Sequence, residues 1–204
     1  FSVYPQYKTY FINTSGQYSG HKTQLWPEYD MPEKYEENCP DMSSFFQDID
    51  EEVLFIVGGS GYISGASLGL LSYIKDKKIS VLYVRPDIEF LSETKRLIEK
   101  CTFHILQEYA RSGVFERVFL FENSSLEGLI GDLTITNFYD KINDYIVPIV
   151  HMINVFDRTK PIMTSFSSLA PSSKICTIGI KNFSSGEEEM FFPLDTIREK
   201  RYYY

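Results

Sequence analysis

The sequence predicts an α/β fold with a mostly parallel sheet and helices on both faces of that sheet. Three short apolar runs, at residues 53–57, 79–84 and 118–121, have the length and composition of strands that are buried on both sides. Apolar residues at helical spacing fill the two intervals between these runs, at residues 68–74 and 92–111. This alternation of strand and helix is typical of parallel strands joined by right-handed crossovers.

The predicted helices carry recognisable signals. Gly113 stands where a C-terminal cap is expected for the helix at residues 92–111. A second long helix is predicted over residues 138–156, and Pro148 in its middle predicts a kink or a missing hydrogen bond. Residues 126–130 predict a short helix before it.

The segments outside this core are less regular. Residues 7–13 predict a short strand, and residues 43–48 predict a short helix. Residues 17–40 carry three prolines and no clear periodicity, so they are predicted to be mostly loop. Near the end, residues 174–180 and 189–192 predict a pair of strands, which we expect to form a short C-terminal β appendage.

Composition restricts the partners. The net charge is −8 and no Lys/Arg stripe is present, so no nucleic-acid partner is expected, because phosphate contacts need clustered basic residues. No apolar run reaches the roughly 18 residues of a membrane-spanning helix, so no membrane partner is expected. Cys39, Cys101 and Cys176 are widely separated and lack metal-binding or CxxC spacing. We therefore expect reduced thiols, no protein-held metal and a cytoplasmic location.

A glycine-rich turn follows the first apolar run and opens the first helix. Backbone N–H groups and the positive end of a helix dipole at such a junction suit a phosphate, and glycine lets the anion approach closely. The candidate phosphate-binding residues are Gly58, Gly59, Ser60, Gly61, Ser64 and Gly65. Glycines at this position can also serve only to pack helix on strand, and the spacing matches neither the GxGxxG nor the Walker pattern.

The order of elements resembles the nucleotide-binding half of the tubulin/FtsZ family. That family places an apolar strand, a GGGTGTG-type loop, a helix, a strand, a second helix, a strand ending in Asn and a long central helix in this order. The matching segments are FIVGGSGYISGASLGLL, ISVLYVRPD, VFLFEN and FYDKINDYIVPIVHMINVF. The resemblance covers roughly residues 10–169 and implies a Rossmann-like GTPase domain over residues 1–169. Residues 170–204 would then be a remnant of, or a substitute for, the second domain.

The resemblance implies GTP or GDP as the ligand, with or without Mg²⁺. Asn13, Asn123, Tyr139 and Asn143 resemble the positions that contact guanine and ribose in that family. Tyr139 and Asn143 lie one helical turn apart and so project from the same face of their helix. The alternative for this pair is a core tyrosine and a solvated asparagine.

Several positions depart from the family pattern. Tyr62 and Ile63 replace a Thr and a Gly of the phosphate loop, and a β-branched Ile adds bulk where the backbone would approach a phosphate. Ser165 and Ser168 stand where the family has two acids that position the attacking water. A serine hydroxyl carries no charge at neutral pH, so weak or absent GTP hydrolysis is expected and no catalytic residue is assigned.

Three functions remain open on this basis. The first is a divergent guanine-nucleotide-binding protein that self-associates head to tail into filaments. The second is a scaffold or interaction protein on the same fold that binds no nucleotide. The third is an unrelated Rossmann-like enzyme, which is disfavoured because Asp87 is the only acid near the expected ribose-binding position.

Overall fold

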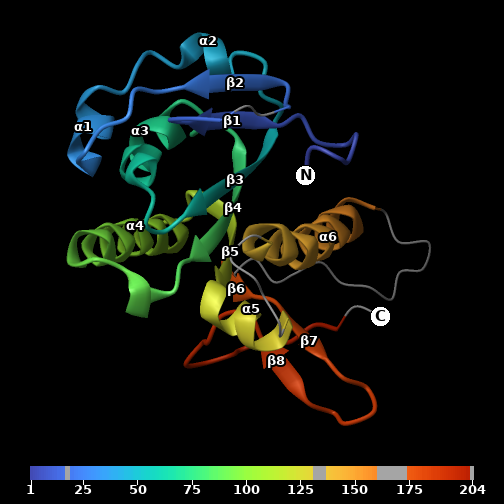
Figure 1. The fold of residues 1–204 in the computed structure, drawn as a ribbon. Helices are drawn as coiled ribbons and strands as arrows, with labels where there is room; N and C mark the ends of the chain where they lie inside the picture. The colour runs from blue at the N-terminus through green and yellow to red at the C-terminus, as the bar shows by residue number, and fades with distance from the viewer. Residues whose placement is uncertain (17–18, 131–136, 160–173, 203–204) are drawn as a thin grey trace.

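The computed structural model describes residues 1–16, 19–130, 137–159 and 174–202. Its centre is a four-stranded sheet in the order β3-β4-β5-β6, with all neighbours parallel (Figure 1). The strands are β3 (Glu52–Gly58), β4 (Lys78–Arg85), β5 (Phe115–Glu122) and β6 (Ile175–Thr177). The predicted parallel sheet is confirmed, and the three predicted apolar runs form its first three strands.

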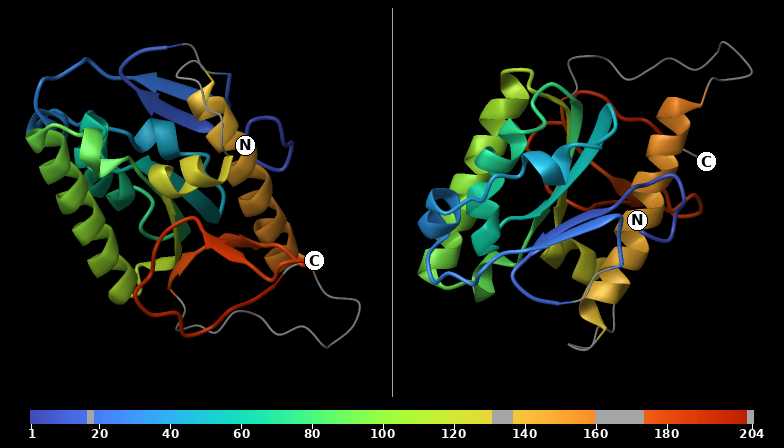
Figure 2. Two further views of the ribbon diagram at one scale, coloured as in Figure 1. Left: turned by 60° about the horizontal axis from the view of Figure 1, so that its bottom comes forward. Right: turned by 90° about the horizontal axis from the view of Figure 1, so that it is seen from above.

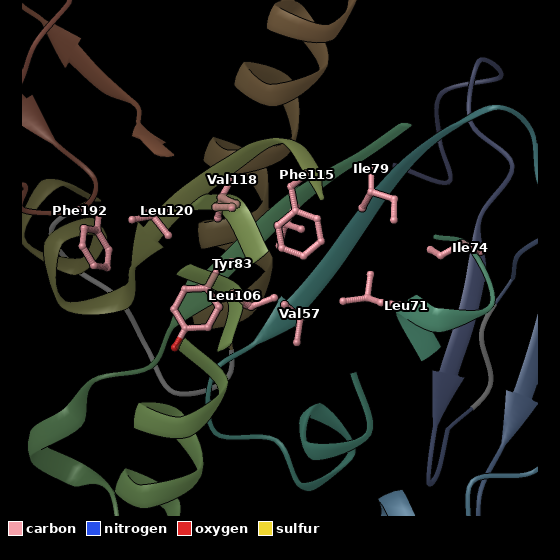
Figure 3. Packing of buried hydrophobic residues seen from close by; sticks show 12 residues of the cluster. Val57, Leu71, Ile74, Ile79, Tyr83, Leu106, Phe115, Val118, Leu120 and Phe192 are labelled. Atoms are coloured by element: carbon pink, nitrogen blue, oxygen red, sulfur yellow. The ribbon is translucent and has the colours of Figure 1, made fainter. Parts of the chain in front are cut away.

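Helices cover both faces of this sheet, as predicted (Figures 1 and 2). The helices are α3 (Ser67–Ser72) and α4 (Glu93–Arg111) on one face and α5 (Asn123–Ile130) and α6 (Phe138–Arg158) on the other. Alternate residues of β4 face two hydrophobic cores on opposite sides of the sheet. Tyr83 packs in the core with Leu106 of α4 (Figure 3), as does Val81, whereas Leu82 packs in the other core with Ile146 of α6. Alternation of this kind follows from the two-residue period of a strand.

The helix boundaries agree with the local signals. Ser92 caps α4 through its hydroxyl, which accepts a hydrogen bond from the Lys95 amide at 3.4 Å. Gly113 follows the end of α4 with φ of +83°, a conformation that favours glycine. α6 continues through Pro148 as one helix, two residues longer at its C-terminal end than predicted.

The N-terminal part forms a layer of its own beside β3 and α3. β1 (Tyr10–Asn13) and β2 (Lys22–Leu25) pair in parallel, and α1 (Pro32–Glu37) and α2 (Ser43–Phe46) follow. The prediction that residues 17–40 are mostly loop was wrong for β2 and α1. These elements have four and six residues, too few to show a periodicity, and they are stabilised by burial of Trp26 and Tyr35 against Ala66.

The C-terminal part is tied to the sheet. The predicted strand pair is present, but its first member is divided into β6, which joins β5, and β7 (Gly179–Lys181), which pairs antiparallel with β8 (Glu188–Met190). Phe191 and Phe192 follow β8 and are buried, one in the core under α6 and the other in the core under α4. Within the described ranges, none of the helices combines the length and apolarity that crossing a bilayer would require.

Candidate functional site

The glycine turn and the head of α6 lie at the same edge of the sheet. Parallel strands end at one edge, so the turn after β3 and Asn123 after β5 share the carboxyl edge. The last turn of α6 lies at the opposite, amino edge, where Arg158 pairs with Glu52 at the start of β3. The first turn of α6 must therefore point toward the carboxyl edge, and α5 packs beside it. The topology therefore places the predicted phosphate-binding turn, Asn123 and the head of α6 at the same edge of the sheet.

The turn itself is a compact 3₁₀ structure. Gly59 donates its amide hydrogen to the Val84 carbonyl at 3.0 Å, and the Ser64 hydroxyl donates to the Gly58 carbonyl at 2.5 Å. The 3₁₀ helix η1 (Tyr62–Ala66) then leads into α3. The amides of Ser60 and Gly61 make no hydrogen bond within the described parts of the chain. Together with the amides of Tyr62 and Ile63 at the start of the following 3₁₀ helix, these are the donors that remain for an external acceptor.

Two glycines of the turn are explained by packing alone. A Cβ at Gly59 would overlap the Tyr83 hydroxyl, and a Cβ at Gly65 would lie 3.0 Å from Pro32 Cβ at the start of α1. Gly58 differs, because a Cβ there meets nothing within 4 Å and the residue is exposed. Of the predicted phosphate-binding glycines, Gly58 therefore borders open space, whereas a Cβ at Gly61 would lie 3.0 Å from Ser64 Oγ.

Tyr62 and Ile63 do not project into the space beside Gly58. Both side chains are half-buried and pack against the cluster formed by the N-terminal layer, which contains Trp26 and Tyr35. In this orientation the Ile63 side chain does not crowd a phosphate bound beside Gly58.

Sequence reasoning missed a buried ionic network beside the turn. Glu99 of α4 accepts hydrogen bonds from the Tyr83 hydroxyl at 2.7 Å and from Arg85 Nε at 2.9 Å. The Arg85 guanidinium also lies 3.5 Å from Glu122, at the end of β5. The Arg85 guanidinium carbon also lies 4.5 Å from the ring centroid of Phe103 and 4.5 Å from that of Phe192. The available signals were the charges ending β4 and β5 and the single carboxylate on the apolar face of α4.

The electrostatics of this network matter for any anion at the turn. One arginine faces two carboxylates, so the network carries an excess of one negative charge. Burial, followed by the hydrogen bond to Glu99, raises the pKa of Tyr83 far above its usual range, so that this phenol stays neutral. A phosphate at the turn would feel repulsion from this excess and would depend on backbone donors or on an accompanying cation.

The predicted base-binding residues differ in availability. Tyr139 is 72% exposed and Asn143 is also exposed, so both are open to a ligand at the head of α6. Asn123 is half-buried and is the first residue of α5. Asn13 ends β1, and its side-chain oxygen accepts a hydrogen bond from the Thr14 amide at 2.8 Å. The exposure of Tyr139 rules out the alternative that it is a core residue.

The amino edge carries a second polar feature. A cavity of about 150 Å³ lies between the first residues of β3, β4 and β5 and the last turn of α6. Arg117 pairs there with Asp157 at 2.7 Å. The remaining lining residues are Glu52, Lys78, Ser80, Glu116, Asn154 and Arg158. The cavity mixes both signs of charge, and both arginines already have carboxylate partners.

Two further predictions concern the hydrolysis of GTP and a protein-held metal. Ser165 and Ser168 lie outside the described residues, so the structure does not bear on them. In the described part of the chain, no three His, Cys, Asp or Glu side chains gather closely enough to hold a metal ion.

Comparison with known proteins assigns no family. No protein-family model matches the sequence, and no curated protein matches it either. The class that the structure supports is an α/β protein with a parallel sheet and helices on both faces, and any finer assignment depends on the site.

Proposed function

We propose that this chain binds a guanine nucleotide at the carboxyl edge of its four-stranded sheet and hydrolyses GTP slowly or not at all. The observation that supports the proposal is that the glycine turn, Asn123 and the head of α6 all lie at that edge. The amides of Ser60 and Gly61 would donate to a phosphate, and Tyr139 would stack on the base. The likeness of the element order to the tubulin/FtsZ family suggests guanine as that base.

The two carboxylates of the buried network do not offer a protein-held magnesium site. Mg²⁺ in proteins takes one or two carboxylates together with phosphate oxygens and waters. Glu99 and Glu122 are the nearby carboxylates of the network, and both already face Arg85.

Head-to-tail self-association is part of this proposal. It would set the amino edge of one copy, where basic and acidic side chains are mixed, against the carboxyl edge of the next copy. The free thiols Cys39, Cys101 and Cys176 support a cytoplasmic location, because such thiols persist in reducing compartments.

The first test replaces the exposed aromatic at the head of α6. Tyr139→Ala should weaken binding of GDP and GTP by roughly 5- to 150-fold, because stacking of a base on an aromatic ring contributes about 1–3 kcal/mol. Isothermal titration calorimetry, with and without Mg²⁺, measures the change. Tyr145→Ala is the matched control, since Tyr145 lies on another side of the same helix and is 37% exposed.

Three results would contradict the proposal. Equal affinity of Tyr139→Ala and the wild type would remove Tyr139 from the site. Preference for an adenine dinucleotide would favour the Rossmann-like enzyme. Rapid GTP turnover by the wild type would contradict the roles assigned to Ser165 and Ser168.

The second candidate is a scaffold that binds no nucleotide. Packing alone explains Gly59 and Gly65, and the negative excess at the network disfavours an anion. A wild-type protein that is folded, purifies without nucleotide and shows no heat of binding with millimolar GDP or GTP would establish this candidate instead.

A further inference from the structure

Glu99 of α4 lies directly against the glycine turn. The residue is 6% exposed, and a Cβ built on Gly59 would come within 3.0 Å of the Glu99 Cγ. The Gly59 amide donates to the Val84 carbonyl at 3.0 Å, which holds this part of the turn next to the carboxylate. A buried acid therefore borders the segment that would contact the phosphates of a nucleotide.

The charge of Glu99 is only partly balanced. In the described parts of the chain its ion pair is with Arg85, and the same guanidinium also faces Glu122. One cation therefore serves two carboxylates. Because Glu99 is buried, water screens the remaining negative charge less than it would on the surface.

The cations that precede Glu99 on α4 do not offset this charge. Lys95 and Arg96 lie one helical turn before it, and both are exposed to solvent. Arg96 is also engaged elsewhere, because it donates to the carbonyls of Ile88 and Glu89, each at 3.1 Å. Exposed charges of this kind are screened by water and salt, so the excess beside the turn persists.

We propose that Glu99 determines the nucleotide preference of this site, and that its charge makes the site favour a nucleoside diphosphate over a triphosphate. This inference rests on the proposed nucleotide function. Repulsion at a given distance grows with the charge of the ligand, and a triphosphate carries more negative charge than a diphosphate. The free amides of the turn attract both ligands but supply only partial charges against this repulsion.

Glu99→Gln isolates the charge from the structural role of this side chain. The amide oxygen of glutamine can still accept the hydrogen bonds that the Tyr83 hydroxyl and Arg85 Nε donate to Glu99. Arg85 then faces a single carboxylate, that of Glu122, so the network becomes neutral. A change in nucleotide preference therefore reports the charge, whereas loss of stability would report the structural role.

Isothermal titration calorimetry with GDP and GTP, in low salt with EDTA and without Mg²⁺, tests the preference. The wild type should bind GDP at least roughly threefold more tightly than GTP, and Glu99→Gln should strengthen binding of GTP by roughly tenfold and of GDP by roughly threefold. Glu108→Gln is the matched control, because it removes the same charge from an exposed site near the other end of α4. It should leave both affinities within about twofold of the wild type.

The outcomes separate this inference from the proposed function. A wild type that prefers GTP would overturn the role of Glu99, as would a folded Glu99→Gln variant with the wild-type ratio of GDP to GTP affinity, and in both cases nucleotide binding itself would stand. Absence of binding to either nucleotide, in the wild type and in the variant, would overturn the proposed function together with this inference. If Glu99→Gln does not fold, Glu122→Gln removes the same excess from the other side of Arg85 and is read in the same way.

Discussion

Two carboxylates of this protein hold similar partners in different surroundings. Glu99 accepts from Tyr83 and Arg85 with a side chain that is 7% exposed. Glu188 of the C-terminal hairpin accepts from Lys181 at 2.9 Å, Lys200 at 2.5 Å and Tyr202 at 2.7 Å, with a side chain that is 24% exposed. The number of hydrogen bonds therefore does not tell which cluster contributes more to stability.

Exposure of the carboxylate to solvent is what distinguishes the contributions of the two clusters to stability. Removing one partner of a buried ion pair leaves a charge that water cannot reach, whereas an exposed carboxylate regains water when it loses a partner. The Glu99 cluster also joins α4, two strands and the segment after β8, while the Glu188 cluster joins only a hairpin and the chain end that follows it. We expect the Glu99 cluster to affect the stability of the whole fold and the Glu188 cluster to affect only the local order of the chain end.

The strongest test of this contrast removes the central cation. Arg85→Ala should lower the free energy of unfolding by about 3–5 kcal/mol, because it leaves Glu99 and Glu122 facing each other without a counter-charge. Urea denaturation measures the change. Arg111→Ala removes an exposed arginine that pairs with Glu108 and should cost less than about 1 kcal/mol. Equal costs for the two variants would show that burial does not distinguish them.

A smaller effect is expected where the glycine turn meets the network. Gly59→Ala should destabilise by about 1–3 kcal/mol, because its Cβ overlaps the fixed Tyr83 hydroxyl. Gly58→Ala should stay within about 0.5 kcal/mol, because its Cβ meets nothing. Thermal unfolding compares the two, and combining Gly59→Ala with Tyr83→Phe should recover part of the loss. A larger cost at Gly58 than at Gly59 would refute this account of the turn.

The smallest effect is expected at Glu188. Hydrogen bonds from Lys200, Tyr202 and Lys181 lower its pKa from 4.5 to about 2. A carboxyl group whose folded pKa is depressed stabilises the structure above its unfolded pKa and loses that contribution as the pH falls through the folded value. The backbone amides of residues 200–202 should therefore exchange more slowly than those of an unfolded chain at pH 5. This protection should be lost as the pH falls from about 4.5 to 2. Glu188→Gln should weaken this protection from exchange at pH 5. If the variant is protected as well as the wild type, the hydrogen bonds of Glu188 are not the cause of the protection.

Part of the fold and of the site could be predicted from local pattern. The three apolar runs predicted β3, β4 and β5, because strands buried on both faces need no polar alternation. Ser92 and Gly113 mark the ends of α4 through hydrogen bonding and backbone conformation that depend on one residue each. The shared edge of the glycine turn, Asn123 and the head of α6 also followed from the order of elements.

Other features depended on contacts between distant residues. The four-residue β2 and six-residue α1 exist because Trp26 and Tyr35 are buried against the turn, and no local period indicates that burial. The meeting of Arg85 with Glu99, Glu122, Phe103 and Phe192 joins four segments, so no single segment reveals it.

By itself, the sequence determined which segments become strands and helices of the central sheet, because period and composition act over a few neighbouring residues. Only the tertiary structure decided which glycines of the turn serve packing and which border open space, and which charges are buried beside it. Those properties depend on side chains that arrive from other elements, and their positions are set when the whole chain excludes water from its core.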